Sequence, residues 1–446
     1  MTNQDPNFTK KGPVEILQKL IRFDTTNPPG NEGPCIEYIK GLFESAGVET
    51  KVFECRENRP NLVARIPGDN LSRPLLVQGH VDVVTADTQS WKYPPFEGRL
   101  ADGFVWGRGA LDMKGGVAMM ISALLKIIEQ GGKPPGDIVF VALSDEEAGG
   151  NCGAKFMVEN HPEQFSGVRY ALGEFGGASM DFAGRRFYPV QVSEKQICWM
   201  QATLRGPGGH GSMPVQGGSM GKLGRLLCAL DTKSLPVRIT PVARQMIETM
   251  ARHARFPANF ILKQLLNPLL TNFVLYLLGK RAGILRPLLH NTVSPTIVNG
   301  GSKVNVIPSE IVLTLDGRLV PGSGPQDLIN EIRALAGDGI NIEVTRHDPG
   351  PEKPDMSMFS LIEDVLKAAD PQAVAVPLLM PGVTDARFFS KLGIQTYGFL
   401  PLKLPRGLDY FSLIHNANER VPADALEFGA GALLDLFLRH GTQDSA

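Results

Sequence analysis

Acidic and imidazole side chains recur along this chain in small clusters, most of them at the end of an apolar run. They occur in the segments His80-Val81-Asp82, 109–116 with Asp112, Asp145-Glu146-Glu147, Gly173-Glu174 and 415–419 with His415. The ends of buried strands are where an α/β sheet opens its ligand crevice. Two imidazoles and several carboxylates, without paired Cys, are the ligand chemistry of a hydrolytic zinc site. The set indicates a site for two metals.

Each cluster has a second interpretation when it is taken alone. His80 and Asp82 share one face of a strand, so Asp82 can orient the imidazole, but the pair could equally face solvent. Asp112, in a glycine-rich loop before a helix, could be a helix N-cap. Glu146 and Glu147 are either solvated or divided between a metal and a proton-transfer role. Their joint occurrence, in order and mostly at strand ends, favours the metal site.

The elements around these clusters predict an α/β sheet. Helices are expected over 13–23, 33–46 and 115–129, and strands over 61–66, 74–79 and 137–143. After residue 350, strands at 374–379 and 394–400 and helices at 385–392 and 424–439 continue the pattern. Near-continuous apolar strands separated by helices are typical of a mostly parallel sheet that helices cover on both faces.

The pattern changes near Val190. Segments 196–205 and 304–320 alternate polar and apolar residues like strands of a half-exposed sheet, and 326–336 is typical of an amphipathic helix. The sequence therefore predicts an α/β catalytic domain over residues 1–190 and 350–446. A smaller α+β domain with an antiparallel sheet is predicted to be inserted at 191–349.

Composition sets broad limits on function. The chain has 446 residues, 43% hydrophobic and 20% charged, as in an ordinary globular protein of about two domains. Its formal net charge of -1 gives no electrostatic reason to expect nucleic acid or an anionic membrane as partner. The five scattered cysteines and the polar N-terminus predict reduced thiols, no secretory signal and a cytoplasmic location.

The predicted insertion contains an unusual apolar block at 256–289, within a helical stretch of about 231–290. Polar residues and Pro268 interrupt the block before about 20 apolar residues, the length that a spanning helix needs, so no transmembrane segment is expected. The block favours buried helices or a dimer contact. The alternatives are a hydrophobic rim of the substrate pocket and a patch that contacts a membrane surface.

These motifs resemble the di-zinc family of aminoacylases, acetylornithine deacetylases, succinyl-diaminopimelate desuccinylases and carboxypeptidases. The resemblance extends from the turn Thr25-Thr26-Asn27-Pro28 to the His415 motif. It also includes the segments 208–214, 305–308, 316–318 and 384–388. The resemblance implies that the inserted domain is a ferredoxin-like lid and dimerisation domain and that the protein is a homodimer.

The resemblance also implies roles for individual residues. Two Zn²⁺ ions per chain, or Co²⁺ as a substitute, would share Asp112, with His80 and Glu174 completing one shell and Glu147 and His415 the other. Glu146 would act as general base on the zinc-bound water. Asp82 would hold the His80 tautomer. The two ions would leave net positive charge among these ligands, which suits a developing oxyanion.

A further set of residues in this chain is expected to contact the substrate. The resemblance implies that His210 stabilises the oxyanion in the partner subunit's site, although a turn histidine is the alternative. It implies substrate contacts for Asn305, Arg318, Thr384 and Arg387. The planar fork of an arginine suits a carboxylate, but Arg318 and Arg387 could also form structural ion pairs.

The expected reaction is hydrolysis of N-acyl amino acids, or of short peptides with a free carboxylate, by metal-activated water. A dipeptidase or aminopeptidase on the same scaffold is one alternative. Arg318 and Arg387 argue against an aminopeptidase, because such an enzyme must bind the ammonium group of its substrate, whereas arginines favour a carboxylate. A catalytically silent metal-binding relative is the other alternative, and an intact Glu146 argues against it. If the apolar block contributes to the substrate pocket instead of a dimer contact, Phe260, Leu266, Phe273 and Tyr276 would line an acyl channel.

Overall fold

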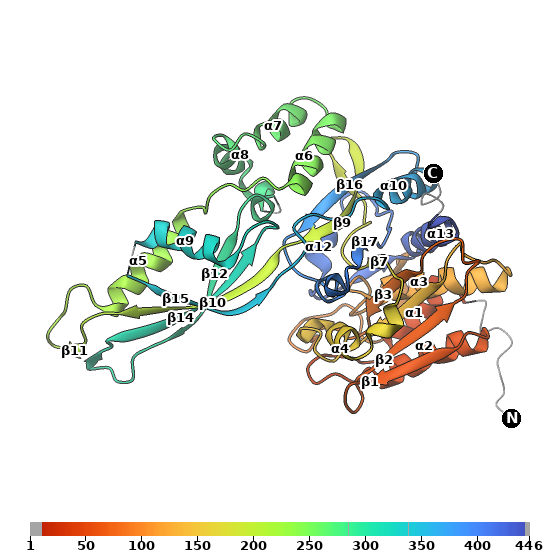
Figure 1. The fold of residues 1–446 in the computed structure, drawn as a ribbon, viewed down its shortest axis with the longest axis horizontal. Coiled ribbons are helices and arrows are strands. Elements are labelled where there is room, and N and C mark those ends of the chain that lie inside the picture. Colours follow the sequence, from red (N-terminus) through yellow and green to blue (C-terminus); the bar gives the residue numbers. More distant parts are fainter. Residues whose placement is uncertain (1–10, 284, 338, 442–446) are drawn as a thin grey trace. The chain divides into compact units, whose positions relative to one another are not determined.

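The computed structural model describes residues 11–283, 285–337 and 339–441, which form two compact units of an α/β protein (Figure 1). Unit 1 comprises the chain up to Val192, residues 355–376 and the chain from Thr384 onward. Unit 2 comprises Ser193–Pro354 and Pro377–Val383. The α/β class predicted from the sequence is confirmed.

A nine-stranded sheet runs through unit 1. Its strands, in the order in which they pair, are β1 (Thr50–Glu54), β2 (Pro60–Ile66), β6 (Ile138–Leu143), β3 (Leu75–His80), β7 (Tyr170–Gly173), β17 (Gln395–Gly398), β9 (Arg185–Glu194) and β16 (Ala373–Met380), with β8 (Met180–Phe182) beside β9. The four central strands β6, β3, β7 and β17 are parallel, and antiparallel pairs flank them. The carboxyl ends of the central strands therefore share one edge.

Helices cover both faces of this sheet. They are α1 (Pro13–Ile21), α2 (Gly33–Ser45), α3 (Lys114–Glu129), α4 (Ala154–Asn160), α10 (Phe359–Ala369), α11 (Ala386–Phe389) and α13 (Ala423–Arg439). On one face Phe140 of β6 packs against Phe43 of α2. On the other face Val139 and Val141 join a buried cluster with residues of α4 and α11. Since β6 is buried at every position, its uninterrupted apolar sequence fits a strand covered on both sides.

Short elements complete unit 1. They are β4 (Arg99–Ala101), β5 (Phe104–Trp106), β18 (Arg420–Pro422), α12 (Tyr410–Leu413) and the 3₁₀ turns η2 (Glu146–Ala148), η3 (Pro162–Phe165) and η6 (Ser390–Leu392). β18, β5 and β4 form an antiparallel sheet. This sheet joins the chain just before Asp112 to the chain just after His415.

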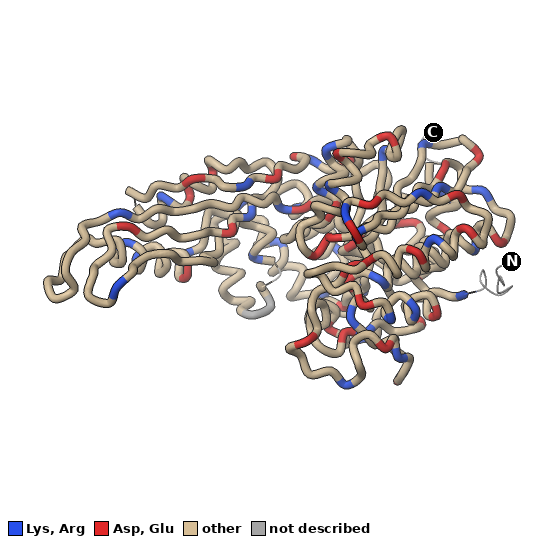
Figure 2. Tube along the Cα trace, turned by 90° about the horizontal axis from the view of Figure 1, so that it is seen from below, with Lys and Arg blue, Asp and Glu red and all other residues tan. Residues whose placement is uncertain are grey.

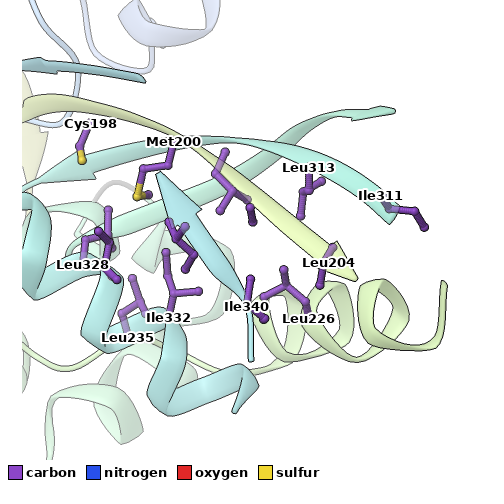
Figure 3. Packing of buried hydrophobic residues seen from close by; sticks show 14 of the residues in the cluster. Cys198, Met200, Leu204, Leu226, Leu235, Ile311, Leu313, Leu328, Ile332 and Ile340 are labelled. Carbon is purple, nitrogen blue, oxygen red and sulfur yellow. The ribbon is translucent and has the colours of Figure 1, made fainter. Parts of the chain in front are cut away.

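Unit 2 is built on an antiparallel sheet in the order β12 (Thr292–Asn299), β14 (Glu310–Leu319), β10 (Gln196–Arg205) and β15 (Asn341–Asp348). Buried and partly exposed residues alternate along β14, because one face of the sheet packs on a core. Helices α5 (Ser219–Thr232) and α9 (Pro325–Ala336) cover that face. Their Leu226 and Leu328 pack with Met200 and Leu313 of the sheet (Figure 3).

One predicted strand of unit 2 is divided in the structure. The segment 304–320 forms β13 (Val306–Ile307), which pairs with β11 (Gly209–His210), and then β14, which pairs with β10 and β12. Pro308, which has no N–H to donate, lies at the break. Two candidate residues lie at this separate ribbon: His210 is in β11, and Asn305 directly precedes β13.

The apolar block forms helices on unit 2. They are α7 (Ala258–Gln264) and α8 (Thr271–Leu278), preceded by α6 (Pro241–His253) and followed by the 3₁₀ turns η4 (Gly279–Ala282) and η5 (Arg286–Leu288). The favoured expectation is buried helices or a dimer contact. Burial within the chain does not hold for the outward sides, since Phe260, Phe273 and Tyr276 are exposed in unit 2, while the dimer contact stays a prediction. A channel lining would be covered, so these three side chains do not line a channel within unit 2. No helix among the described residues is long and apolar enough to span a membrane.

Candidate metal centre

The five candidate metal ligands converge at the shared edge of the central strands in unit 1. His80 ends β3, Glu147 lies in the turn η2 after β6, and Glu174 follows β7. β6, β3 and β7 are neighbours in the sheet, so their ends are adjacent. Asp112 lies in the loop before α3, and His415 lies between α12 and β18.

The carboxylate of Asp112 lies between the two imidazoles. Nε2 of His80 is 3.2 Å from Oδ1 of Asp112, and Nε2 of His415 is 3.0 Å from Oδ2. On the far sides, His80 Nε2 is 3.3 Å from Glu174 Oε2 and His415 Nε2 is 3.3 Å from Glu147 Oε1. The geometry divides the ligands into two groups that share Asp112. This is the arrangement expected of a site for two ions with one bridging carboxylate.

The donor set fits metal ions. Both oxygens of Glu174 and Oε1 of Glu147 are buried and accept no aligned hydrogen bond within the described chain, so they are available as ligands. Three carboxylates and two imidazoles suit Zn²⁺ and similar ions. His80, Asp112 and Glu147 offer ligand atoms within 4.8 Å of one another, as do His80, Glu146 and Glu174.

Burial and mutual contacts perturb the protonation of these groups. Burial raises the pKa of Glu174 to about 8. Contacts with Asp112 and Glu147 raise the pKa of His415 to about 10. Burial alone would raise the pKa of Asp112, but contacts with His415 and His80 outweigh it and lower that pKa overall. Without an ion, therefore, the site is held together by protonated imidazoles and shared protons.

Metal binding should consequently be linked to proton release. Because the pKa of Glu174 and that of His415 lie above 7, both groups hold protons at neutral pH and must lose them to act as ligands. We expect Zn²⁺ affinity to rise at least about tenfold per pH unit between pH 6 and 7.5, since one released proton gives that slope.

Isothermal titration of the metal-free chain in buffers of different ionisation enthalpy measures this release. His161, a histidine of unit 1 that belongs to neither metal group, provides the matched control as His161→Ala. That variant should keep the pH dependence. An affinity independent of pH, with no buffer-dependent heat, would contradict the protonation states.

Asp82 orients more of the site than the sequence indicated. Nδ1 of His80 is 3.0 Å from the backbone oxygen of Asp82 and 3.5 Å from its Oδ1. The Asp82 carboxylate also accepts hydrogen bonds of 3.1 Å from the backbone N–H groups of Glu146 and Glu147, and one of 2.8 Å from Asn27. One buried carboxylate thus fixes a ligand imidazole and the turn that carries two functional glutamates.

Glu146 lies beside the ligands without pairing to a cation. Burial, together with the nearby Glu174 carboxylate, raises the pKa of Glu146 well above its usual range. Its carboxylate lies within 4.8 Å of ligand atoms of His80 and Glu174. A carboxyl group with a raised pKa at this position is suited to take up a proton from water and to return it.

A buried glutamate that sequence reasoning missed shapes the Asp112 loop. Glu419 accepts hydrogen bonds from the backbone N–H groups of Gly109, Leu111 and Asp112, at 3.1, 2.7 and 3.2 Å. It also pairs with Arg108 at 2.8 Å. The only sequence signal was its place four residues after His415. Glu419 therefore ties the His415 segment to the loop that presents Asp112.

A second buried network, also missed, supports the turn before Glu146. The Arg59 guanidinium pairs with Asp145 and with Glu32, each at 2.8 Å. Asp145 also accepts hydrogen bonds from Asn27 and from the backbone N–H of Cys152. This network fixes both sides of the turn that presents Glu146 and Glu147.

Two of the predicted substrate contacts, Thr384 and Arg387, lie at the start of α11 in unit 1. Arg387 is buried, and its guanidinium donates to the backbone oxygens of Gly149 and Thr384 at 3.0 and 3.1 Å. Neighbouring Asp385 is also buried, which raises its pKa to about 7. Among the described residues no carboxylate oxygen lies within 4.0 Å of the Arg387 guanidinium, which instead holds the chain just after Glu147 through the Gly149 oxygen. Arg387 therefore positions this segment.

The remaining candidates lie in unit 2. His210 and Asn305 are both exposed on the ribbon of β11 and β13, where the N–H of Gly211 donates to the Asn305 oxygen at 2.8 Å. Nδ1 of His210 is 2.7 Å from the Ser212 hydroxyl. Arg318 on β14 makes a two-point ion pair with Asp316 at 2.8 and 3.1 Å. That pair is the structural alternative foreseen for this arginine.

The chain is similar to several known proteins. The family model described as peptidase family M20/M25/M40 matches residues 76–439. A "Probable carboxypeptidase S-like 2" of Dictyostelium discoideum is 29% identical over 79% of this chain and 69% of its own. The "N-fatty-acyl-amino acid synthase/hydrolase PM20D1" of Xenopus tropicalis is 29% identical over 94% of this chain and 84% of its own.

A solved structure shares the fold. The M20 family metallo-carboxypeptidase Sso-CP2 from Sulfolobus solfataricus superposes with a TM-score of 0.66, covering 96% of this chain and 99% of its own. At 16% identity this likeness concerns the fold alone. Together with the sequence matches, it spans the central sheet, the candidate ligands and unit 2.

Proposed function

Since this chain belongs to peptidase family M20/M25/M40 and is an enzyme that hydrolyses amide or peptide bonds, we propose that it cleaves N-acyl amino acids or peptides with a free carboxylate. The observation that supports this proposal most is the position of Asp112 between His80 and His415. We place two Zn²⁺ ions per chain there, with Co²⁺ as a possible substitute, because three carboxylates and two imidazoles are the donor set of a hydrolytic zinc site.

The ligand assignment follows the two groups in the structure. His80 and Glu174 would hold one ion, Glu147 and His415 the other, and Asp112 both. When bound, the ions would polarise the scissile carbonyl and lower the pKa of water. Asp82 keeps the His80 ring in place through the contacts at Nδ1, so that Nε2 faces Asp112 and Glu174 and would be the ligand atom.

Glu146 is proposed as the general base and acid. Its carboxylate takes the proton from the attacking water and delivers it to the nitrogen of the leaving amine. Asp82 accepts from the Glu146 N–H and thereby fixes the backbone that carries this side chain.

We propose that Asn305, Thr384, Arg318 and Arg387 contact the substrate, with the two arginines suited to its carboxylate. Arg318 already pairs with Asp316, and Arg387 already holds two backbone oxygens. A bound carboxylate would therefore add to these contacts. Similarity to a carboxypeptidase S-like protein and to an N-fatty-acyl-amino acid hydrolase supports a substrate with a carboxylate beside the cleaved amide.

A hydrolysis panel tests the substrate class. We expect the metal-loaded chain to cleave N-acetyl-methionine, and to cleave N-acetyl-methionine amide roughly tenfold to hundredfold more slowly in kcat/KM, because a hydrogen bond to a charged group contributes about 1.5–3 kcal/mol. Faster cleavage of dipeptides with a free amino terminus would favour the dipeptidase alternative instead. Equal rates on the acid and its amide would contradict carboxylate recognition.

Acyl chain length is the second variable of the same panel. Each buried methylene can contribute about 0.8 kcal/mol. Even a third of that over the six methylenes that separate octanoyl from acetyl would raise kcat/KM more than about tenfold. A rising series would extend the proposal to fatty-acyl substrates. A flat or falling series would restrict it to short acyl groups.

We further propose a homodimer in which His210 stabilises the oxyanion in the partner subunit's site. His210 is exposed on unit 2 and its ring is oriented by Ser212, so its Nε2 is left for another partner. Mixing inactive His210→Ala chains with inactive Glu146→Ala chains should restore part of the activity, because one mixed site has both groups intact. Absent complementation, despite proven subunit exchange, would rule out the role across subunits.

The five cysteines are free in the structure. Unpaired thiols at five scattered positions support the proposal of a reducing, cytoplasmic location. Mass determination after denaturation and alkylation without reduction, on protein from its native source, should find five modified thiols.

A further inference from the structure

Unit 2 has exposed apolar side chains on the segment that contains α7 and α8. We call this exposed set the apolar face, and its residues are Phe256, Phe260, Leu269, Phe273, Tyr276 and Leu277. Each of these large side chains is between 59% and 92% exposed. Single exposed apolar residues are common, but six in one short segment mark a surface that contacts something apolar.

The helices that carry this face are anchored from behind. Leu262 of α7 and Val274 and Leu275 of α8 are buried, while Phe260, Phe273 and Tyr276 lie on the opposite sides of the same helices. α7 and α8 contact each other, and Figure 1 shows them side by side beyond α6. The core of unit 2 therefore does not need the outward side chains, and their exposure is a property of the folded unit.

The segment is strongly basic, unlike the chain as a whole. Residues 241–290 include seven Lys or Arg and a single acidic residue, Glu248, within a chain of net charge -1. Glu248 is paired with Arg244, which leaves the other six cations unbalanced within the segment. Elsewhere basic and acidic residues are intermixed along the trace (Figure 2).

Cations and apolar side chains share the same side of α7. Phe260 and Lys263 are three residues apart on α7, so they are neighbours on its surface, and both are exposed. Phe256, which is also exposed, lies just before the helix. Arg252 and Arg255, also exposed, come directly before it. Aromatic and leucine side chains surrounded by Lys and Arg are the combination by which helices bind the surface of an anionic bilayer.

Charge decides between a bilayer and a second copy of the chain. A symmetric contact would place this basic segment against itself, where like charges repel. An anionic lipid membrane has negatively charged headgroups, which attract the cations, and a hydrocarbon region, which can take up the apolar side chains. From this arrangement we propose that residues 241–290 dock unit 2 on the surface of an anionic lipid membrane, with the apolar face inserted among the acyl chains. This interaction is additional to the hydrolytic function and does not depend on it.

Vesicle sedimentation of the full chain tests the proposal. Binding should be measurable with vesicles containing phosphatidylglycerol and at least about tenfold weaker with pure phosphatidylcholine, because several cations lose their partner. Raising the salt from 0.1 M to 0.5 M should weaken binding to the anionic vesicles by a similar factor, since screening shortens the reach of exposed charges.

Variants separate the apolar and the electrostatic contributions. The combined variant Phe260→Ser, Phe273→Ser and Tyr276→Ser should reduce binding at least about tenfold. The charge variant Arg255→Glu and Lys263→Glu should do the same without altering any apolar residue. The matched control replaces exposed apolar residues of unit 1, Leu71→Ser and Leu100→Ser, and should bind like the unaltered chain.

Three results would overturn the proposal. One is failure of the unaltered chain to sediment with phosphatidylglycerol vesicles at 0.1 M salt. Another is an equal loss of binding in the Leu71 and Leu100 control. The third is an oligomer, measured by light scattering, that dissociates in the Phe260, Phe273 and Tyr276 variant while the unaltered chain ignores vesicles; this would assign the face to a second copy. Circular dichroism of each variant confirms that it is folded.

Discussion

Replacing Glu146 by Gln should lower kcat by at least about 10³-fold while leaving metal binding intact. A general base contributes typically 10²–10⁴-fold, and here the same group must also protonate the leaving amine. The amide keeps the shape of the side chain but cannot accept the proton. Since burial and Glu174 already disfavour the charged form of Glu146, the neutral amide should not destabilise the fold.

Steady-state kinetics and metal analysis of the same preparation test this expectation. Glu163→Gln, an exposed glutamate of the same unit, is the matched control and should retain the parent kcat. A Glu146→Gln chain with two bound ions and near-parent kcat would refute the assignment of the base. A variant that is inactive because it has lost its metal would instead make Glu146 a ligand.

Replacing Asp112 by Ala should abolish both metal loading and turnover. Asp112 contacts both imidazoles, and no other carboxylate of the described centre does so. Its removal takes one ligand from each proposed ion at once. Because the Asp112 carboxylate pairs with both imidazoles and raises their pKa, its removal takes a stabilising partner from each, and the metal-free variant should unfold at a lower temperature than the metal-free parent.

Metal content at saturating Zn²⁺ measures this effect, with Asp69→Ala, an exposed aspartate of unit 1, as control. The control should bind two ions. If Asp112→Ala also retained two ions per chain, the shared carboxylate would be disproved. The single-ligand variants Glu147→Ala and Glu174→Ala should each weaken one ion more than the other, because they belong to different groups.

The parallel centre of the fold could be read from the sequence because its signal is local. β6 is apolar at every position and buried at every position, and the carboxylates follow directly after it. Strand ends in a parallel sheet share one edge, so residues distant in sequence could be expected to meet there. His415, by contrast, follows no strand, and only its resemblance to a family motif indicated its place.

Long-range support of the site could not be predicted in this way. Glu419 binds three backbone N–H groups some 300 residues earlier in the chain, and Arg59 pairs with Asp145, which lies 86 residues later in the chain. A buried glutamate and a surface glutamate look alike in a sequence, since burial depends on the tertiary fold. The same limit explains the apolar block, where hydrophobicity predicted burial but Phe273 and Tyr276 are exposed.

The most direct measurement is the number of Zn²⁺ ions bound by the chelator-treated chain, determined together with its rate on N-acetyl-methionine. The account predicts two ions per chain at saturation, no turnover without metal, and recovery of turnover as metal is restored. A maximum of one ion per chain, or hydrolysis that continues in the metal-free protein, would contradict a two-metal centre built around Asp112.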